Sequence, residues 1–144
     1  HWKHGGVVGV RGYGAGVIGR HSDSPELFPN MAHFHTFRVN QPTGWFYTTK
    51  TLRQLCDIWE KYGSGLSNHQ GATGDIIILG GTTPLLQDCY NALPAETGLI
   101  LGGSASRLRT PAGCVGAARC ECSCIDTLDI CNTLTHFFQD ELRQ

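Results

Sequence analysis

The chain has 144 residues, of which 40% are hydrophobic and 16% charged, and its formal net charge is −1. This length suits about one domain with a hydrophobic core, and the composition is that of an ordinary globular protein. Lysine and arginine are scattered, so no basic stripe indicates a nucleic-acid partner or a membrane surface. No apolar run is long enough for a membrane span. Because the chain starts at His1 and stops at Gln144 inside an expected helix, we expect an internal piece of a longer protein.

The N-terminal segment is glycine-rich, and residues 14–19 satisfy the dinucleotide pattern G-x-G-x-x-G. This pattern indicates a nucleotide site only at a strand-to-helix turn with an acidic residue roughly 20 positions later. Residues 20–25 break a helix instead, and residues 38–42 contain no acid. We therefore expect a loop in which the backbone passes close to another group.

The next segment predicts a strand, a turn and a helix. Residues 33–39 alternate apolar and polar side chains, residues 41–44 form a turn, and residues 45–47 return as the hairpin partner. Thr48 or Thr49 caps a helix that ends at Gly63. Cys56 falls on the apolar side of this helix and is expected to be buried. The apolar side consists of Leu52, Leu55, Cys56, Trp59 and Tyr62.

The second half continues the alternation of strands and helices. Residues 76–79 are a continuous apolar run of strand length, and Thr83-Pro84 begins a helix that Pro94 is expected to end. Residues 99–101 predict another short strand, and helical spacing extends from about 120 to 142. The order strand, strand, helix, strand, helix, strand predicts an α+β fold with ferredoxin-like character.

Cysteine is the most informative residue type in the chain. There are seven cysteines, and five of them lie between residues 114 and 131. A secreted disulfide framework would have an even number spread along the chain, so a reducing cytoplasm fits better.

Three interpretations of the cysteine run compete. A zinc site needs two well-spaced ligand pairs, and the one-apart thiols Cys120, Cys122 and Cys124 are too close together for one tetrahedral ion. Reduced structural thiols are possible, but packing does not require this density. An iron–sulfur cluster with Cys114 and Cys120 as a C-x₅-C pair is favoured, with its remaining ligands elsewhere.

The whole chain resembles the alpha subunit of dissimilatory sulfite reductase, a sirohaem and [4Fe–4S] enzyme. Several distinctive stretches carry the resemblance: residues 1–5, 12–14, 16–20, 33–36, 52–56, 73–76, 108–112 and 139–142.

The resemblance implies a domain division and a cluster. Residues 1–100 correspond to a ferredoxin-like nitrite/sulfite reductase half-domain, and residues 101–144 to the start of the sirohaem and [4Fe–4S] domain. Cys114 and Cys120 match the family's first ligand pair, and the second pair is expected beyond Gln144. Cys122, Cys124 and Cys131 are expected to be packing or reserve thiols.

The resemblance also implies roles for polar residues. Arg38 and Arg109 match the substrate-site arginines, whose planar guanidinium suits an oxyanion such as sulfite. Arg20 matches a residue that contacts the sirohaem carboxylates, and Thr73 is expected to lie against the macrocycle. His33 and His35 receive no site role, because a structural histidine is an equally good interpretation.

The expected partners follow from the same resemblance. They are a homologous beta subunit, in an alpha2beta2 assembly, and a small cysteine-carrying protein that accepts the sulfur. The alternatives are an assimilatory sulfite or nitrite reductase, or a non-catalytic iron–sulfur module for electron transfer. A pair of converging arginines argues against the last, since an electron carrier has no use for them.

Overall fold

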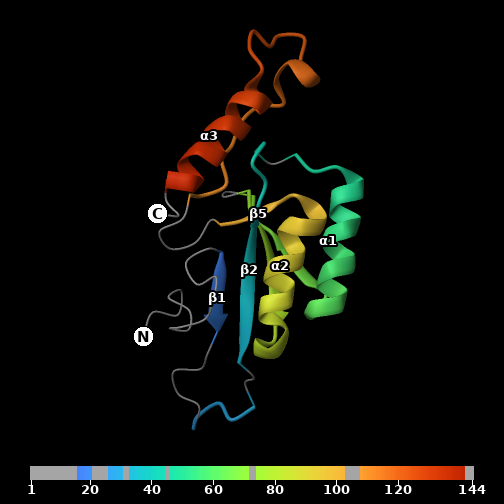
Figure 1. Ribbon diagram of the computed structural model, residues 1–144, viewed down its shortest axis with the longest axis vertical. Helices are drawn as coiled ribbons and strands as arrows, with labels where there is room; N and C mark the ends of the chain where they lie inside the picture. The colour runs from blue at the N-terminus through green and yellow to red at the C-terminus, as the bar shows by residue number, and fades with distance from the viewer. Residues whose placement is uncertain are drawn as a thin grey trace.

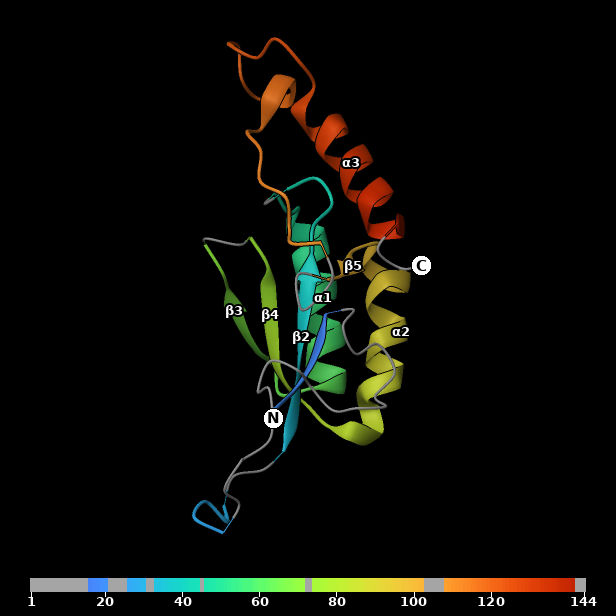
Figure 2. The same ribbon diagram turned by 90° about the vertical axis from the view of Figure 1, so that its left-hand side faces the viewer.

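The computed structural model describes residues 16–20, 26–30, 33–44, 46–71, 74–102 and 108–141, and of Arg20 only the backbone. An antiparallel sheet of five strands is covered on one face by two helices, and a third helix extends away from this body (Figures 1 and 2). The α+β prediction is confirmed. No helix of the described part has the length and apolarity needed to cross a bilayer.

The sheet is built around its central strand. Strands β1 (Val17–Arg20), β2 (Phe34–Asn40), β4 (Ile76–Gly81) and β3 (Leu66–His69) lie in the order β1-β2-β4-β3. The short strand β5 (Ile100–Leu101) pairs with the last residues of β2, beyond the stretch that pairs with β1. β2 therefore has β4 on one edge, and β1 followed by β5 on the other.

Helices α1 (Thr49–Tyr62) and α2 (Leu86–Thr97) bury the sheet's apolar face. Thr48 caps α1 by accepting a hydrogen bond of 3.1 Å from the Thr51 amide, and Gly63 ends the helix, as predicted. Trp59 is central: its ring packs edge-to-face on Phe37 at 5.8 Å, and its Nε1 donates to the Leu66 carbonyl at 2.8 Å. The core consists of Val17, Phe37, Val39, Leu55, Ile58, Trp59, Ile76, Ile78, Leu86, Cys89, Leu93, Leu99 and Leu101.

Two expectations around α1 are wrong. Phe46 and Tyr47 form no strand, and Trp45 lies outside the described residues. Both edges of β2 are already occupied, so no position remains for a hairpin partner. Cys56 is exposed, because the buried face of α1 passes through Leu55, Ile58 and Trp59 instead.

The second half contains three further differences. A short 3-10 turn, η1 (Thr83–Leu85), precedes α2, and α2 continues through Pro94 to Thr97 before Gly98 ends it with φ +69. Pro94 is exposed, so the helix loses only one hydrogen bond there. Strand β3 was not predicted, and its side chains are all exposed. The last helix, α3 (Thr127–Glu141), begins later than expected, after the turn η2 (Gly116–Ala118).

Gly16 confirms the predicted close approach of the backbone. Its φ is +91°, and a Cβ there would lie 2.6 Å from the Gly102 nitrogen and 2.8 Å from the Arg38 carbonyl oxygen. The Arg38 amide donates to the Gly16 carbonyl, and the Gly102 amide donates to the Arg38 carbonyl. The residues after Gly16 form β1, so the expected loop is wrong from Val17 onward, and no helix follows the glycine pattern as a nucleotide site would require.

Gly16→Ala should therefore destabilise the protein by more than the roughly 1–2 kcal/mol that a left-handed alanine costs, because a steric clash with backbone adds to it. Gly98→Ala is the matched control, since Gly98 also has a positive φ but no atom within 4 Å of the added Cβ. Thermal unfolding of both variants measures the difference. Equal losses of stability would show that the junction of β1, β2 and β5 is not tightly packed at Gly16.

Candidate functional site

Arg38 lies on the face of β2 opposite the helices, because Phe37 and Val39 point into the core on the other side. Its Nη1 donates to Asp75 Oδ2 at 3.1 Å. The Asp75 side chain is completely buried, and that of Arg38 is 16% exposed. A carboxylate buried this deeply needs a cation and hydrogen bonds, and Arg38 supplies the cation.

The second carboxylate oxygen of Asp75 contacts a residue from another segment of the chain. Thr110, itself buried, donates from Oγ1 to Asp75 Oδ1. The neighbouring Arg109 has an exposed side chain. Asp75 thus contacts Arg38 directly and, through Thr110, the segment that contains Arg109, while the substrate role of both arginines stays a prediction.

Tyr47 completes the surroundings of this carboxylate. Burial, together with the negative charge of Asp75, raises the pKa of Tyr47 to about 12. The Tyr47 hydroxyl donates to the Gly74 carbonyl at 3.5 Å. Tyr47 is therefore a neutral donor at physiological pH and adds no charge to the site.

The cysteine-rich loop follows β5 and precedes α3 in the sequence, and it lies at the end of α3 that points away from the sheet (Figures 1 and 2). Cys114 and Cys120 are both exposed and lie on either side of η2, and the Cys120 amide donates to the Gly116 carbonyl at 2.9 Å. Hydrogen bonds from the Thr127 side chain and the Gly116 backbone lower the pKa of the Cys114 thiol. This favours the thiolate, which is the form that binds iron or zinc.

The loop is held to the start of α3 by Thr127. Its Oγ1 lies 2.8 Å from the Cys114 carbonyl oxygen and 3.6 Å from the Cys114 sulfur, so its one proton can be donated to the carbonyl or, when the thiol is ionised, to the sulfur. Gly116 has φ +60°, and a Cβ there would lie 2.2 Å from the Thr127 oxygen. Only glycine allows this close packing of the loop against the helix.

The predicted cluster ligands form no complete metal site. No group of three or more metal-binding side chains is formed among the residues that the structure describes. The assignment of Cys114 and Cys120 as two of the four thiolates of a [4Fe–4S] cluster therefore stays a prediction. Cys122 and Cys124 are exposed in this chain, whereas Cys131 is half-buried.

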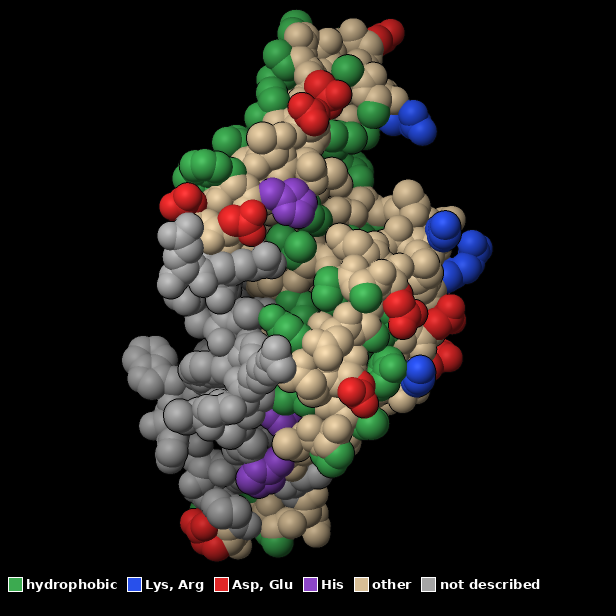
Figure 3. Space-filling view, in the orientation of Figure 1, with side chains coloured by type: hydrophobic (Ala, Val, Ile, Leu, Met, Phe, Trp, Pro, Cys, Tyr) green, Lys and Arg blue, Asp and Glu red, His purple; other side chains and the backbone are tan. Residues whose placement is uncertain are grey.

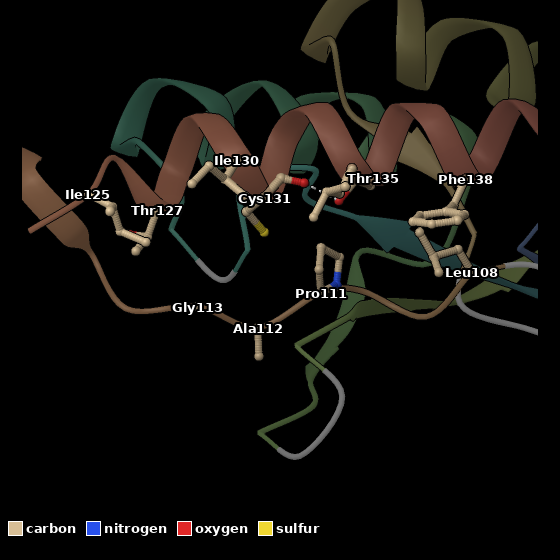
Figure 4. Close-up of a pocket in the computed structure, with 11 residues that line it drawn as sticks. Leu108, Pro111, Ala112, Gly113, Ile125, Thr127, Ile130, Cys131, Thr135 and Phe138 are labelled. Carbon is tan, nitrogen blue, oxygen red and sulfur yellow. Dashed lines mark hydrogen bonds between the residues drawn. The ribbon is translucent and has the colours of Figure 1, made fainter.

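An apolar groove of about 410 Å³ separates α3 from the segment around Pro111. In Figure 4 the Cys131 thiol points from α3 into this groove, and Phe138 lies beside Leu108 at its other end. The groove is lined by Leu108, Pro111, Ala112, Gly113, Ile125, Thr127, Ile130, Cys131, Leu134, Thr135 and Phe138.

Helix α3 contacts the body through polar residues. Its buried side chains are Thr135, which donates to the Pro42 carbonyl at 3.1 Å, and Gln139. The amides of Gln139 and of the equally buried Asn40 have no hydrogen-bond partner among the described residues. The large apolar side chains of α3 remain exposed and gather along the helix in Figure 3: Ile130, Leu134, Phe137 and Phe138.

Two predicted cofactor residues lie outside the described side chains. Thr73 is not described, and of Arg20 only the backbone in β1 is. The expected contacts of both residues with sirohaem therefore stay predictions.

Comparisons with known proteins show which family this chain resembles. Residues 29–80 match the model of the nitrite/sulfite reductase ferredoxin-like half domain. The chain is 56% identical over 144 residues to the alpha subunit of dissimilatory-type sulfite reductase from Nitratidesulfovibrio vulgaris, covering 100% of this chain and 33% of that one. This chain is homologous to the alpha subunit of dissimilatory-type sulfite reductase.

Two further matches support the assignment to dissimilatory sulfite reductase. The alpha subunit from Allochromatium vinosum is 45% identical over 144 residues, covering 34% of that protein. The crystal structure of dissimilatory sulfite reductase I superposes with a TM-score of 0.79 at 53% identity, over 99% of this chain and 33% of that one. The chain thus spans about a third of the length of the alpha subunits it matches.

Sequence analysis missed several residues that surround Arg38 and Cys114 in the structure. Asp75 and Thr110 both occur in stretches that carry the resemblance, but neither received a role. An acid placed directly before a buried apolar strand is a signal for Asp75, since such a carboxylate needs a partner. Thr127 has no comparable local signal, because its contact with Cys114 depends on the folded loop.

Thr127→Val should raise the pKa of the Cys114 thiol, because it removes the hydroxyl that stabilises the thiolate. Thr127→Ser keeps the hydroxyl and is the control. The measurement is the pH dependence of alkylation in the cluster-free protein, followed by mass spectrometry of the tryptic peptide 110–119, in which Cys114 is the sole cysteine. An unchanged alkylation profile in the valine variant would contradict the role given to Thr127.

Proposed function

We propose that this chain is the part of a dissimilatory sulfite reductase alpha subunit that supplies anion-binding arginines and two cluster thiolates. The six-electron interconversion of sulfite and sulfide is the activity proposed for the complete enzyme. The observation that carries the proposal is the 56% identity to a named alpha subunit, and the ion pair between Arg38 and the buried Asp75 supports it.

The arginines suit the substrate. Sulfite is a small oxyanion, and reducing it to sulfide removes three oxygens as water and consumes six protons. Guanidinium groups stay charged throughout and donate to oxyanions in a fixed planar geometry. Cations fixed before the reaction stabilise negative charge in the transition state without further rearrangement. We assign this role to Arg38, whose orientation Asp75 fixes, and to the exposed Arg109.

The thiols suit the cofactor. When bound, sirohaem and a [4Fe–4S] cluster would pass on electrons from an external donor and provide an iron for the substrate. Of the cluster's ligands, we assign two to this chain: Cys114, whose thiolate is stabilised by Thr127 and Gly116, and Cys120. We expect the other two from sequence beyond Gln144. The proposal includes sirohaem contacts for Arg20 and Thr73 but derives no step from them.

The surface supports a larger assembly. Helix α3 turns four large apolar side chains to solvent, beside an apolar groove and two buried amides without described partners. Such a surface is characteristic of a contact with further polypeptide. We propose that the rest of the alpha subunit and a homologous beta subunit cover it, in an alpha2beta2 assembly. A small cysteine-carrying protein is proposed as the sulfur acceptor and the cytoplasm as the location.

Arg109→Ala in the complete alpha–beta enzyme tests the proposed function. We expect sulfite turnover to fall by at least about 100-fold, since removing one preorganised charge donor costs about that much or more. Arg119→Ala is the control, because Arg119 is also exposed but has no proposed substrate role. Normal sulfite turnover of Arg109→Ala, with intact haem absorption, would contradict the role of Arg109.

Cys120→Ser in the same enzyme should abolish the visible absorption of the cluster, because a serine oxygen is a poor replacement for a thiolate. Cys122→Ser should retain it, although Cys122 is two residues away and equally exposed. Iron content and the electron paramagnetic resonance signal of the reduced cluster measure the difference. Loss of the cluster in Cys122→Ser and its retention in Cys120→Ser would show that Cys114 pairs with the other thiol.

A further inference from the structure

Both carboxylate oxygens of Asp75 accept hydrogen bonds from residues in or next to the proposed substrate site. Oδ2 accepts from Arg38 at 3.1 Å, and Oδ1 accepts from Thr110, which directly follows Arg109. The Asp75 side chain has no exposed surface. Its contacts join segments that are 37 and 35 residues away along the chain.

We propose that Asp75 is a positioning residue for sulfite, which orients Arg38 directly and Arg109 through Thr110. This inference rests on the proposed function, because it assumes that the two arginines bind the substrate. Asp75 itself is not a catalytic residue, since it acts through its neighbours.

The backbone around Asp75 is fixed well enough for this task. Asp75 lies in the connection between β3 and β4, where its carbonyl accepts from the Gln70 amide at 2.9 Å. The Gly74 amide donates to the Gln70 carbonyl at 2.9 Å, and the Tyr47 hydroxyl donates to the Gly74 carbonyl. A carboxylate held by its own backbone in this way can define the position of a side chain that contacts it.

The Arg38 guanidinium is the group whose position Asp75 fixes. It leaves the sheet on the face opposite the core, where the helices α1 and α2 do not contact it. An unrestrained arginine has about 2 kcal/mol of rotamer entropy, which binding of an anion would have to overcome. The contact of Nη1 with Asp75 restricts the guanidinium before the substrate arrives, and preorganisation of this kind increases affinity and rate.

Asp75 acts on Arg109 indirectly, through the neighbouring Thr110. Thr110 is buried, and its hydroxyl bond to Asp75 fixes the backbone at the point where Arg109 projects to the surface. A shift of the Thr110 backbone would displace the Arg109 guanidinium as well. Displacements of about 1 Å in positioning groups are known to reduce rates by about 100-fold.

The test uses the complete sulfite reductase with four single variants and one double variant. Asp75→Asn removes the negative charge but keeps the shape, and Arg38→Ala removes the positioned group. Thr110→Val removes the hydroxyl, and Thr110→Ser keeps it as the matched control. Each enzyme is measured for the KM and kcat of sulfite, for the Kd of sulfite from the change in haem absorption, and for haem content and melting temperature.

We expect Asp75→Asn to raise the KM and Kd of sulfite at least about tenfold with the haem content retained. Thr110→Val should raise the KM and Kd of sulfite by a smaller factor, and Thr110→Ser should leave both at the wild-type values. In the Arg38→Ala background, Asp75→Asn should have much less effect on the sulfite Kd than it has alone, because most of its action passes through Arg38.

The outcomes separate this inference from the proposed function. If Arg38→Ala weakens sulfite binding but Asp75→Asn and Thr110→Val do not, Asp75 is only a structural ion-pair partner and the inference is overturned. If Arg38→Ala leaves sulfite binding unchanged, the substrate role of Arg38 fails first, and the inference fails with it. If Asp75→Asn does not assemble, Thr110→Val decides, and sulfite constants equal to those of Thr110→Ser overturn the inference.

Discussion

The buried carboxylate of Asp75 is the constraint on which the arrangement of the site depends. An isolated charge with no exposed surface is strongly unfavourable, so the fold must bring a cation and donors to it. Arg38 comes from the central strand and Thr110 from the segment after β5. The contacts of Asp75 thereby join the sheet to the segment that leads into the cysteine loop.

Helix α3 buries polar side chains and exposes apolar ones, which is the opposite of an ordinary surface helix. Its inward residues are Thr135 and Gln139, whereas Ile130, Leu134 and Phe137 face solvent. Burying apolar area is the main favourable term in folding, so an isolated chain would not be expected to leave this surface uncovered. The sheet with α1 and α2 has a hydrophobic core of its own, whereas α3 and the cysteine loop leave apolar side chains exposed, as the proposed contact with further polypeptide requires.

Local patterns predicted most of the fold where they coincide with burial. Helix α1 was predictable because a capping threonine, an apolar stripe and a terminal glycine agree with one another. Strand β3 was not, because its residues Leu66–His69 are exposed and show no alternation. The expected hairpin partner of β2 failed for a non-local reason: β1 and β5, which are far away in sequence, occupy the edge of β2 that it needed. Pro94 was expected to end α2, but an exposed proline removes only one hydrogen bond from a helix that is stabilised by burial.

The residues of the site also differ in how far local sequence patterns predict them. The C-x₅-C spacing and the resemblance predict roles for Cys114, Cys120 and the arginines, but no local pattern links Asp75 to Thr110 across 35 residues. A carboxylate beside a substrate-binding cation reduces the attraction of that cation for an anion, which at first argues against it. The reduction is offset when the alternative is a mobile guanidinium, because restraining an arginine in advance removes an entropic cost of binding. Asp75 engages Arg38 through one Nη atom and Arg109 only through its neighbour, so it restrains both arginines while pairing directly with only one.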